Sequence, residues 1–261
     1  MNIDLTGKTA VVTGGSGAIG GAMCEYYIKS GAQVAVVDVN AERGEEFVQT
    51  LRDMGGDAKF FQGDVSDKES MEKMCADVLG TFGKIDILVN NAGVNVGPEG
   101  RVPIQEFAEK DWNRIINIDL SGVYYCSGPI IRHMAERKYG RIINVASIVG
   151  LVPLRYQCAF AAAKAGVVNL TKAMAIELAP DGILVNGICP GSVMFEGTRA
   201  LFYADKEKAD RMMSHIPLGR PGEPHEIAGS TIFLSSDEMT YMTGNILTVD
   251  GGWTCGFARD F

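Results

Sequence analysis

The chain has 261 residues, of which 46% are hydrophobic and 21% are charged, and this balance excludes a disordered or collagen-like protein. Its 24 basic and 32 acidic residues give a formal net charge of −8, which would repel nucleic-acid phosphates and anionic lipid. We therefore expect a globular protein that binds neither nucleic acid nor membrane. The N-terminal residues do not resemble a secretory signal, so we expect a cytoplasmic location, and the scattered Cys and His residues predict no metal site.

Short apolar runs alternate with longer segments of helical periodicity along nearly the whole chain. The predicted strands are residues 9–13, 34–39, 58–65, 86–93, 141–147, 183–191 and 245–252, and the predicted helices are residues 18–30, 41–54, 67–82, 111–138, 155–179 and 223–235. The strands are almost wholly apolar, as strands are when helices cover both faces of a parallel sheet. The pattern predicts an α/β fold, with one doubly wound Rossmann domain over residues 1–261 and a seven-stranded parallel sheet covered by helices on both faces.

A glycine-rich turn, TGGSGAIG, joins the first predicted strand to the first predicted helix. Gly15, Gly17 and Gly20 fit the pattern G-x-G-x-x-G, in which glycine backbone approaches a pyrophosphate and the helix N-terminus stabilises its charge. Asp38 closes the second strand, where its carboxylate would accept hydrogen bonds from ribose hydroxyls and repel a 2′-phosphate. The sequence therefore predicts NAD as the cofactor in preference to NADP. The residues of this region that we expect to contact NAD are Gly14, Ser16, Gly17, Ile19 and Asp38.

The ends of the third and fourth predicted strands also carry residues suited to a dinucleotide. Asp64 and Val65 offer a carboxylate and an apolar wall for the edge and the face of an adenine ring. Asn91, Ala92 and Gly93 offer an amide and a small-residue backbone that can pack closely against a flat ligand. Because the carboxyl ends of parallel strands meet at one edge of the sheet, we expect all five residues to join the NAD site.

Over essentially its whole length, the sequence resembles the short-chain dehydrogenase/reductase family. The motifs that carry the resemblance are Thr13-Gly14-x-x-x-Ala18-x-Gly20, with Ala18 where the family usually has glycine, Asn91-Ala92-Gly93, Ser147, Lys164 and Pro190-Gly191. The resemblance implies reversible hydride transfer between a nicotinamide cofactor and a small-molecule alcohol or ketone, in a homotetramer or dimer, of which we expect the tetramer. It also implies that Lys164, Pro190, Gly191 and Val193 contact the cofactor and that residues 192–215 form a substrate lid.

The resemblance further assigns the catalytic positions. Ser147 stands at the catalytic serine, Lys164 at the lysine of the YxxxK motif, and Asn117 in the fourth helix where the family keeps its catalytic asparagine. By this resemblance, Ser147 would donate a hydrogen bond to the substrate oxygen. Asn117 would hold a water molecule that links Lys164 to solvent.

The sequence departs from the family at the tyrosine of that motif, where it has Phe160. In the family mechanism the tyrosine hydroxyl exchanges a proton with the substrate oxygen, and losing a general acid or base costs about 10²–10⁴-fold in rate. Tyr156 would lie about 12 Å from Lys164 along a helix, too far to substitute unless the chain is not helical there. We therefore expect a dehydrogenase whose turnover is impaired by Phe160, with an introduced Tyr-to-Phe change favoured over a natural pseudoenzyme.

Two other functions remain open at this stage, a catalytically silent NAD-binding regulatory protein and a family member, such as a dehydratase, whose chemistry needs no phenol. The expected substrate is a polyol, sugar, sugar acid or hydroxy acid, whose acidic group Arg101, Arg155 or Arg199 could bind. Phe195 stands where many relatives have a small hydroxyl residue. The residues expected to contact substrate are Ser147, Phe160 and Arg155.

Overall fold

The computed structural model describes residues 3–199 and 205–256, and one parallel sheet runs through them. Its strands are β1 (Thr9–Thr13), β2 (Gln33–Asp38), β3 (Ala58–Gln62), β4 (Ile87–Asn90), β5 (Gly140–Val145), β6 (Ile183–Pro190) and β7 (Ile246–Val249). They pair in the order β3-β2-β1-β4-β5-β6-β7, so the strand order reverses between β1 and β4. The predicted doubly wound fold with seven parallel strands is confirmed.

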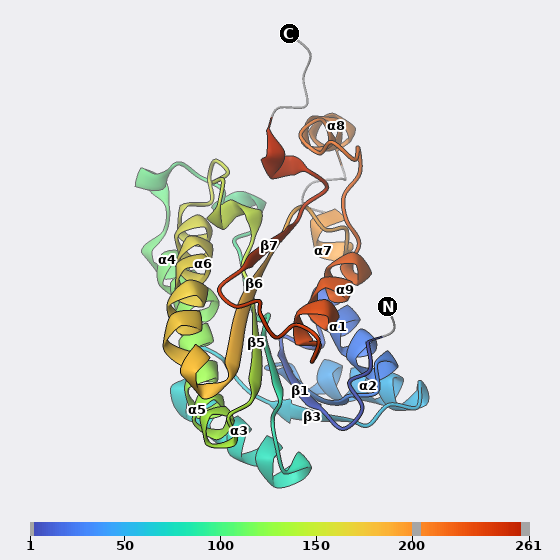
Figure 1. The fold of residues 1–261 in the computed structure, drawn as a ribbon. Coiled ribbons are helices and arrows are strands. Elements are labelled where there is room, and N and C mark those ends of the chain that lie inside the picture. Colours follow the sequence, from blue (N-terminus) through green and yellow to red (C-terminus); the bar gives the residue numbers. More distant parts are fainter. Residues whose placement is uncertain (1–2, 200–204, 257–261) are drawn as a thin grey trace.

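Helices cover both faces of the sheet (Figure 1). One face carries α1 (Ala18–Lys29), α2 (Ala41–Asp53) and α9 (Pro224–Ser235), and the other carries α3 (Lys68–Phe82), α4 (Glu109–Ile116), α5 (Gly122–Arg137) and α6 (Cys158–Leu178). After β6 the chain forms the short α7 (Glu196–Thr198) and then α8 (Lys206–Met213), which lie beyond one end of the sheet. The predicted lid at residues 192–215 falls on this segment, although residues 200–204 and the C-terminal residues 257–261 lie outside the described chain.

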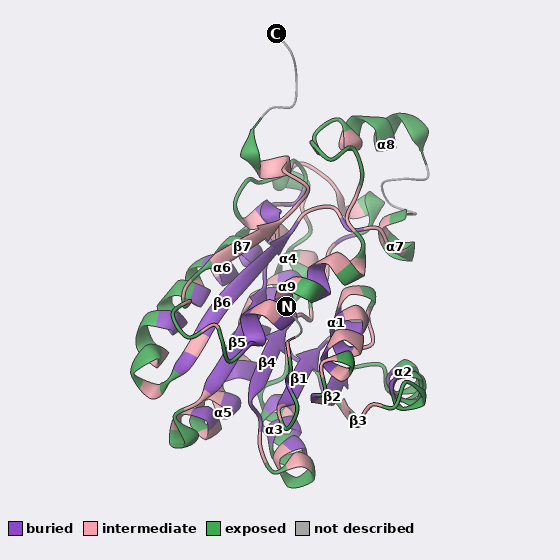
Figure 2. Cartoon of the chain, turned by 45° about the vertical axis from the view of Figure 1, so that its right-hand side comes forward, coloured by how far each residue is buried: buried purple, intermediate pink, exposed green. Residues whose placement is uncertain are grey.

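The core consists of two apolar layers separated by the sheet. Val12 and Val36 point into the layer under α1 and α9, and Val11 and Val37 point into the layer under α3 and α5. The central strands are buried on both faces, as Figure 2 shows, which explains their continuous apolar runs. By length and composition alone, the stretch Cys158–Asp181 could cross a membrane, but core helices pass the same test, and here α6 packs against β6.

The predicted helices agree with the observed ones to within three residues at their ends, and two differences matter for the site. The segment predicted as one helix over residues 111–138 contains a π turn, Asn117–Ser121, between α4 and α5. A π turn holds one more residue than an α turn, so it changes which side chains face the sheet. The second difference lies before α6, which begins at Cys158, and there Tyr156 has a left-handed backbone with φ of 65°.

Asp86, which precedes β4, joins this strand to β1 and α5 through a buried carboxylate that pairs with two partly exposed cations. Its side chain is 1% exposed and accepts hydrogen bonds from Thr9 N at 2.9 Å and Arg137 Nη2 at 2.7 Å, with Lys84 Nζ at 3.2 Å. Burial alone would raise the pKa of Asp86, but Arg137, Thr9 and Lys84 outweigh burial and hold the pKa below its ordinary value. The ionised form is therefore favoured in the fold.

We predict that Asp86→Asn lowers the free energy of unfolding near pH 7 by about 2 kcal/mol, because the buried side chain loses its charged hydrogen bonds to the partly exposed Arg137 and Lys84. Since the folded pKa is lowered, the carboxylate stabilises the fold above the unfolded pKa of about 3.9 and loses that effect as pH falls through the folded pKa. Urea unfolding at neutral and acidic pH measures both effects. Asp77→Asn, which breaks the exposed pair with Lys73, is the control, and an equal loss in the two variants would contradict the prediction.

Candidate active site

Two adjoining cavities open at the carboxyl ends of β1 and β4, where the strand order reverses and doubly wound folds bind ligands. We call them the glycine-turn cavity, which lies beside residues 14–20, and the Ser147 cavity, which has a volume of about 580 Å³. The residues that line both cavities are Ile19, Asn91, Gly93, Val94 and Phe195. The two spaces can therefore receive two parts of one extended ligand.

The glycine turn leaves backbone donors at the start of α1. The N-cap is Gly17, no side chain in the described chain caps the helix, and its first turn carries no acidic residue. A Cβ on Gly20 would lie 2.2 Å from the carbonyl oxygen of Gly14, which itself has φ of +61°. The turn therefore requires glycine at both positions, and its N–H groups are suited to bind a phosphate.

Asp38 lies in the glycine-turn cavity at the end of β2 and is 6% exposed. Ser16 donates to its Oδ2 from Oγ at 2.6 Å and from the backbone N at 3.3 Å. Ser16 itself does not line either cavity, so its contacts in the structure position Asp38. Arg43, which the sequence reasoning missed, also lines this cavity, and its Nη2 lies 3.3 Å from Asp38 Oδ2.

The turn after β4 is fastened to the glycine turn. Asn91 donates from Nδ2 to the carbonyl oxygen of Thr13 at 2.9 Å, and Thr13 Oγ1 accepts from the backbone N–H groups of Asn91 and Ala92 at 3.0 and 3.1 Å. The Asn91 amide thus holds two turns together rather than serving a ligand alone. Asp64 and Val65 also line the glycine-turn cavity, as do Ala92 and Gly93.

The Ser147 cavity brings together the predicted serine, phenylalanine and lysine. Ser147 follows β5 and its Oγ accepts from Val149 N at 3.2 Å, while Phe160 and Lys164 come from successive turns of α6. Lys164 Nζ donates to the carbonyl oxygen of Val145 at 3.1 Å and lies 5.6 Å from the centroid of the Phe160 ring. Pro190, Gly191 and Val193, from the end of β6 and the loop after it, line the same cavity.

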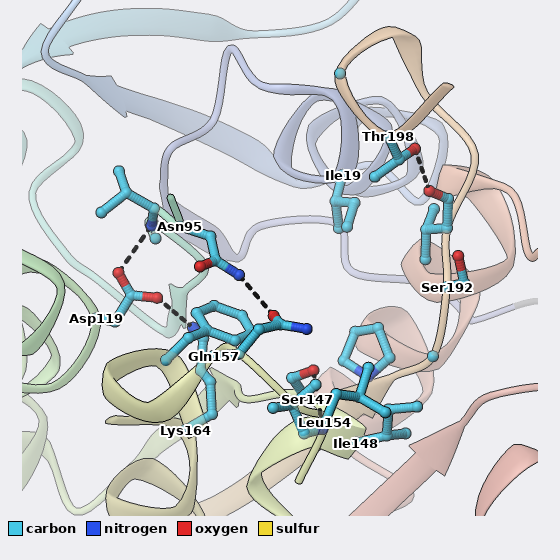
Figure 3. A pocket seen from close by; sticks show the side chains of 18 of the residues that line it. Ile19, Asn95, Asp119, Ser147, Ile148, Leu154, Gln157, Lys164, Ser192 and Thr198 are labelled. Atoms are coloured by element: carbon cyan, nitrogen blue, oxygen red, sulfur yellow. Dashed lines mark hydrogen bonds and ion pairs between the residues drawn. The ribbon is translucent and has the colours of Figure 1, made fainter. Parts of the chain in front are cut away.

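Asn117 does not reach this cavity, so the expectation that it serves Lys164 is corrected by the geometry. Its side chain is exposed and donates to the carbonyl oxygen of Ser66 at 3.3 Å. Asp119 takes the expected place, since it is fully buried, lines the cavity and has Oδ2 3.3 Å from Lys164 Nζ (Figure 3). Asp119 follows the buried Ile115 by four residues and therefore shares its inward face, whereas Asn117 lies two residues away on the outward side. The sequence signal for this residue was an acidic side chain, Asp119, between the apolar Ile118 and Leu120, because an acid buried among apolar residues is usually paired.

The electrostatics of Asp119 reflect its burial. Its Oδ1 accepts a hydrogen bond from Val94 N at 2.8 Å, and its Oδ2 faces Lys164. Burial raises the pKa of Asp119 above its ordinary value, although the positive charges of Lys164 and Arg114 and the Val94 hydrogen bond oppose that rise. A carboxylate and an ammonium thus share one low-dielectric space beside Ser147.

Arg155 and Tyr156 lie outside the lining of both cavities. Both are exposed, and Arg155 Nη2 donates to the hydroxyl of Tyr156 at 2.8 Å. The helical distance does not apply to Tyr156, because residue 156 precedes α6, which is the exception stated with that argument. The structure nevertheless leaves Tyr156 outside the lining of the Ser147 cavity. Arg101 does line this cavity.

Asn95 and Gln157 form a polar wall of the Ser147 cavity that the sequence reasoning missed. Asn95 Nδ2 donates to Gln157 Oε1 at 2.9 Å, and Gln157 is buried (Figure 3). Phe195 lines both cavities and therefore lies where they meet. Trp253 and Met212, from the chain after β7 and from α8, complete the opposite apolar wall.

The parallel sheet, the glycine turn and the lysine-containing cavity together define a nucleotide-binding oxidoreductase of the Rossmann type. The family model described as "short chain dehydrogenase" matches residues 8–205. The chain belongs to the short-chain dehydrogenase/reductase family, whose members use nicotinamide cofactors, and this confirms the resemblance found in the sequence.

Individual relatives cover nearly the whole chain. It is 39% identical to the 3-oxoacyl-(acyl-carrier-protein) reductase FabG of Chlamydia pneumoniae over 97% of this chain and 100% of that protein. It is 37% identical to the cis-4-hydroxycyclohexanecarboxylate dehydrogenase of Sinomonas cyclohexanicum, over 95% and 96% of the two chains. The crystal structure of a short-chain type dehydrogenase/reductase from Mycobacterium marinum matches with a TM-score of 0.88 at 33% identity, over 97% and 98%.

The glycine turn gives a direct test of cofactor binding. We predict that Gly20→Ala raises the dissociation constant for NADH by about 10-fold or more, because the new methyl group would collide with the Gly14 backbone and shift the turn. Gly80→Ala, on the exposed side of α3 with no atom within 4 Å of the new Cβ, is the matched control. NADH fluorescence titrations measure both variants, and unchanged binding by the Gly20 variant would contradict the role of this turn.

Proposed function

We propose that the protein interconverts a secondary alcohol and the corresponding ketone on a small polar substrate, with NAD as the cofactor. The observation that carries the proposal is that a phosphate-binding glycine turn and a cavity containing Ser147 and Lys164 adjoin at Gly93. The residues that would hold NAD line the two cavities, and Ser16 would position Asp38 among them. They are Gly14, Gly17, Ile19, Asp38, Asp64, Val65, Asn91, Ala92, Gly93, Lys164, Pro190, Gly191 and Val193. When bound, NAD supplies or accepts the hydride.

The carboxylate of Asp38 supports NAD over NADP. It lies buried in the glycine-turn cavity, where it would accept hydrogen bonds from ribose hydroxyls and repel a 2′-phosphate. Arg43 lies beside it and would attract the same phosphate, but its guanidinium is paired with Asp38. The preference for NAD over NADP therefore depends on whether the ribose end of the nucleotide contacts the Asp38 carboxylate or the Arg43 guanidinium.

A hydroxy acid is the substrate class that the Ser147 cavity favours. Arg101 lines this cavity, and its planar guanidinium matches the geometry of a carboxylate; burial lowers the pKa of this guanidinium below its ordinary value. Asn95 and Gln157 add polar groups for further hydroxyls. The name of the Sinomonas relative, a dehydrogenase of a hydroxycyclohexanecarboxylate, fits an alcohol and a carboxylate in one molecule.

Within this cavity, Ser147 would donate a hydrogen bond to the substrate oxygen and Lys164 would supply positive charge. Phe160 lines the same cavity but has no hydroxyl, so it cannot exchange a proton with the substrate as the family's tyrosine does. We therefore propose that turnover is lower than in a variant with tyrosine at this position. A catalytically silent NAD-binding protein is the second candidate, and Phe160 is the observation that favours it.

We further propose that the protein acts as a cytoplasmic homotetramer. Large apolar side chains on the outer surfaces of α4, α5 and α6 support an assembly, because Trp112, Tyr124 and Ile176 are 38%, 65% and 78% exposed in the single chain. Light scattering coupled to size exclusion tests this proposal, and a monomer would contradict it.

The charges beside the ribose site predict a change of cofactor preference. Asp38→Ala should weaken NADH binding about 10-fold and strengthen NADPH binding by a similar factor, because Arg43 is then available to a 2′-phosphate. Adding Arg43→Ala should remove the gain for NADPH. Fluorescence titrations with both nucleotides measure these constants. Equal affinities of the native chain for NADH and NADPH would contradict the proposed preference.

The proposed activity is tested by following NADH absorbance for the native chain and Phe160→Tyr with hydroxy acids, keto acids, polyols and sugars. We expect both proteins to bind NADH, the acids to react faster than neutral polyols, and the variant to be faster by up to about 10²-fold. Failure of both proteins to bind NADH would overturn the proposal. NADH binding without turnover by either protein would favour the silent NAD-binding protein, and loss of water without a change in NADH would identify a dehydratase.

A further inference from the structure

The buried ion pair between Asp119 and Lys164 has no counterpart in the mechanism described above. The two side chains are 0% and 6% exposed, with Oδ2 and Nζ 3.3 Å apart. Taking both charges out of water costs several kcal/mol per ion, so such a pair is weak support for stability alone. The pair faces the Ser147 cavity, where a charged group can act on a ligand.

Phe160 and Asp119 act on the same ammonium group. In a site with a phenol at position 160, the positive charge of Lys164 would activate that phenol as an acid or base. Here the neighbouring ring is Phe160, whose centroid lies 5.6 Å from Nζ, and Asp119 compensates the charge. The electrostatics therefore suit the ammonium itself rather than a phenol beside it.

Lys164 also has a donor to spare. An ammonium carries three N–H groups. Within the described residues its contacts are the carbonyl oxygen of Val145 at 3.1 Å and the carboxylate of Asp119 at 3.3 Å. Since Lys164 lines the Ser147 cavity, a further N–H is available to a ligand there, either the cofactor that Lys164 is expected to contact or an oxygen atom bound beside Ser147.

We infer that Lys164 is the proton donor and acceptor of this active site and that Asp119 is its positioning residue. The inference rests on the proposed alcohol–ketone function. In reduction, a hydride adds to the carbonyl carbon, the electron pair of the C=O π bond moves to the oxygen, and that oxygen takes a proton from Lys164 Nζ. The neutral amine then takes a proton from solvent, and oxidation of the alcohol runs through the same steps in reverse.

The structure provides room for this pair at Gly93. A Cβ on Gly93 would lie 2.9 Å from Asp119 Oδ2 and 3.2 Å from Lys164 Nζ. A side chain at residue 93 would therefore push the carboxylate and the ammonium apart. Val94 N adds a hydrogen bond to Oδ1 that fixes the orientation of the carboxylate.

The pair also predicts an acid limit to the activity, by which we mean a fall in the rate of ketone reduction as pH drops through the pKa of Asp119. The charged groups that face Asp119 are Lys164 from α6 and Arg114 from α4, and both favour the ionised carboxylate. Burial nevertheless raises the pKa of Asp119, so the carboxylate becomes protonated at a higher pH than an ordinary aspartate as pH falls. Below that point Lys164 loses its counter-charge, and ketone reduction should slow.

A double-mutant cycle at positions 119 and 160 tests the inference through kcat for ketone reduction at saturating NADH. In the native background, Asp119→Asn should lower kcat about 10-fold and remove the acid limit from the pH profile, because a buried ammonium without a counter-charge tends to lose its proton. In the Phe160→Tyr background the same change should alter kcat by less than about threefold, because the phenol then supplies the proton and Lys164 is no longer the acid. A merely structural role for Asp119 would lower kcat in both backgrounds.

Two further variants complete the cycle. Lys164→Met should lower kcat of the native chain by about 10²-fold or more at saturating NADH. Asp77→Asn, which removes the carboxylate of an exposed Asp–Lys pair, should change kcat by less than about twofold.

A readout that needs neither substrate nor turnover is the ¹³Cγ NMR signal of Asp119 in NADH-bound protein, identified by its absence in Asp119→Asn. We expect the Asp119 pKa to rise by about one unit or more in Lys164→Met, because the variant removes the nearest positive charge. An unchanged titration would show that the pair does not form in solution and would overturn the inference.

The outcomes separate the inference from the proposed function. Suppose that the native chain binds NADH and reduces a ketone, and that Asp119→Asn changes neither the rate nor the pH profile. This result would overturn the inference and leave the proposed function standing. A native chain that is silent on a ketone reduced by Phe160→Tyr would overturn the inference as well, because Lys164 would then not replace the phenol. Absence of NADH binding would overturn the function, and the inference with it.

Discussion

The pairing of β1 with β4 is the constraint on which the rest of the structure depends. Ala10, Val11 and Val12 pair with Ile87, Leu88 and Val89, so the chain order reverses at the centre of the sheet. After β1 and β4 the chain turns toward opposite faces of the sheet. The two turns therefore diverge, and the two cavities lie between them. Thr13 then joins the turns through the Asn91 backbone and side chain, which fixes the width of the opening. The apolar core supports this arrangement because both strands are buried on both faces.

The fold could be predicted because each of its strands is specified by residues that are close together in the sequence. Each strand of the sheet is a short apolar run bounded by polar or glycine-rich turns, and all seven predicted ranges overlap the observed strands. The glycine turn was equally predictable, because the positions of Gly17 and Gly20 relative to a strand and a helix are visible in the sequence. Asp38 could be placed in the cavity for the same reason, since it is the last residue of its strand.

The details of the site were less accessible because they depend on tertiary geometry. Helical periodicity cannot show a π turn, and whether Asn117 or Asp119 meets Lys164 depends on how this segment packs against α6. The left-handed backbone of Tyr156 likewise breaks the helical register that the sequence suggested. Arg43 was missed because its place beside Asp38 follows from how α2 packs on β2, and no motif records that contact.

The arrangement around Lys164 bears on how Phe160 arose. A single Tyr-to-Phe change in an otherwise intact site would leave a lysine whose charge is free to activate a phenol. In this structure a buried carboxylate from a different element compensates that charge. Because burying Asp119 is costly without Lys164, the carboxylate and the ammonium depend on each other. This mutual dependence involves no atom of residue 160, so an introduced Tyr-to-Phe change stays the prediction that the motif gave.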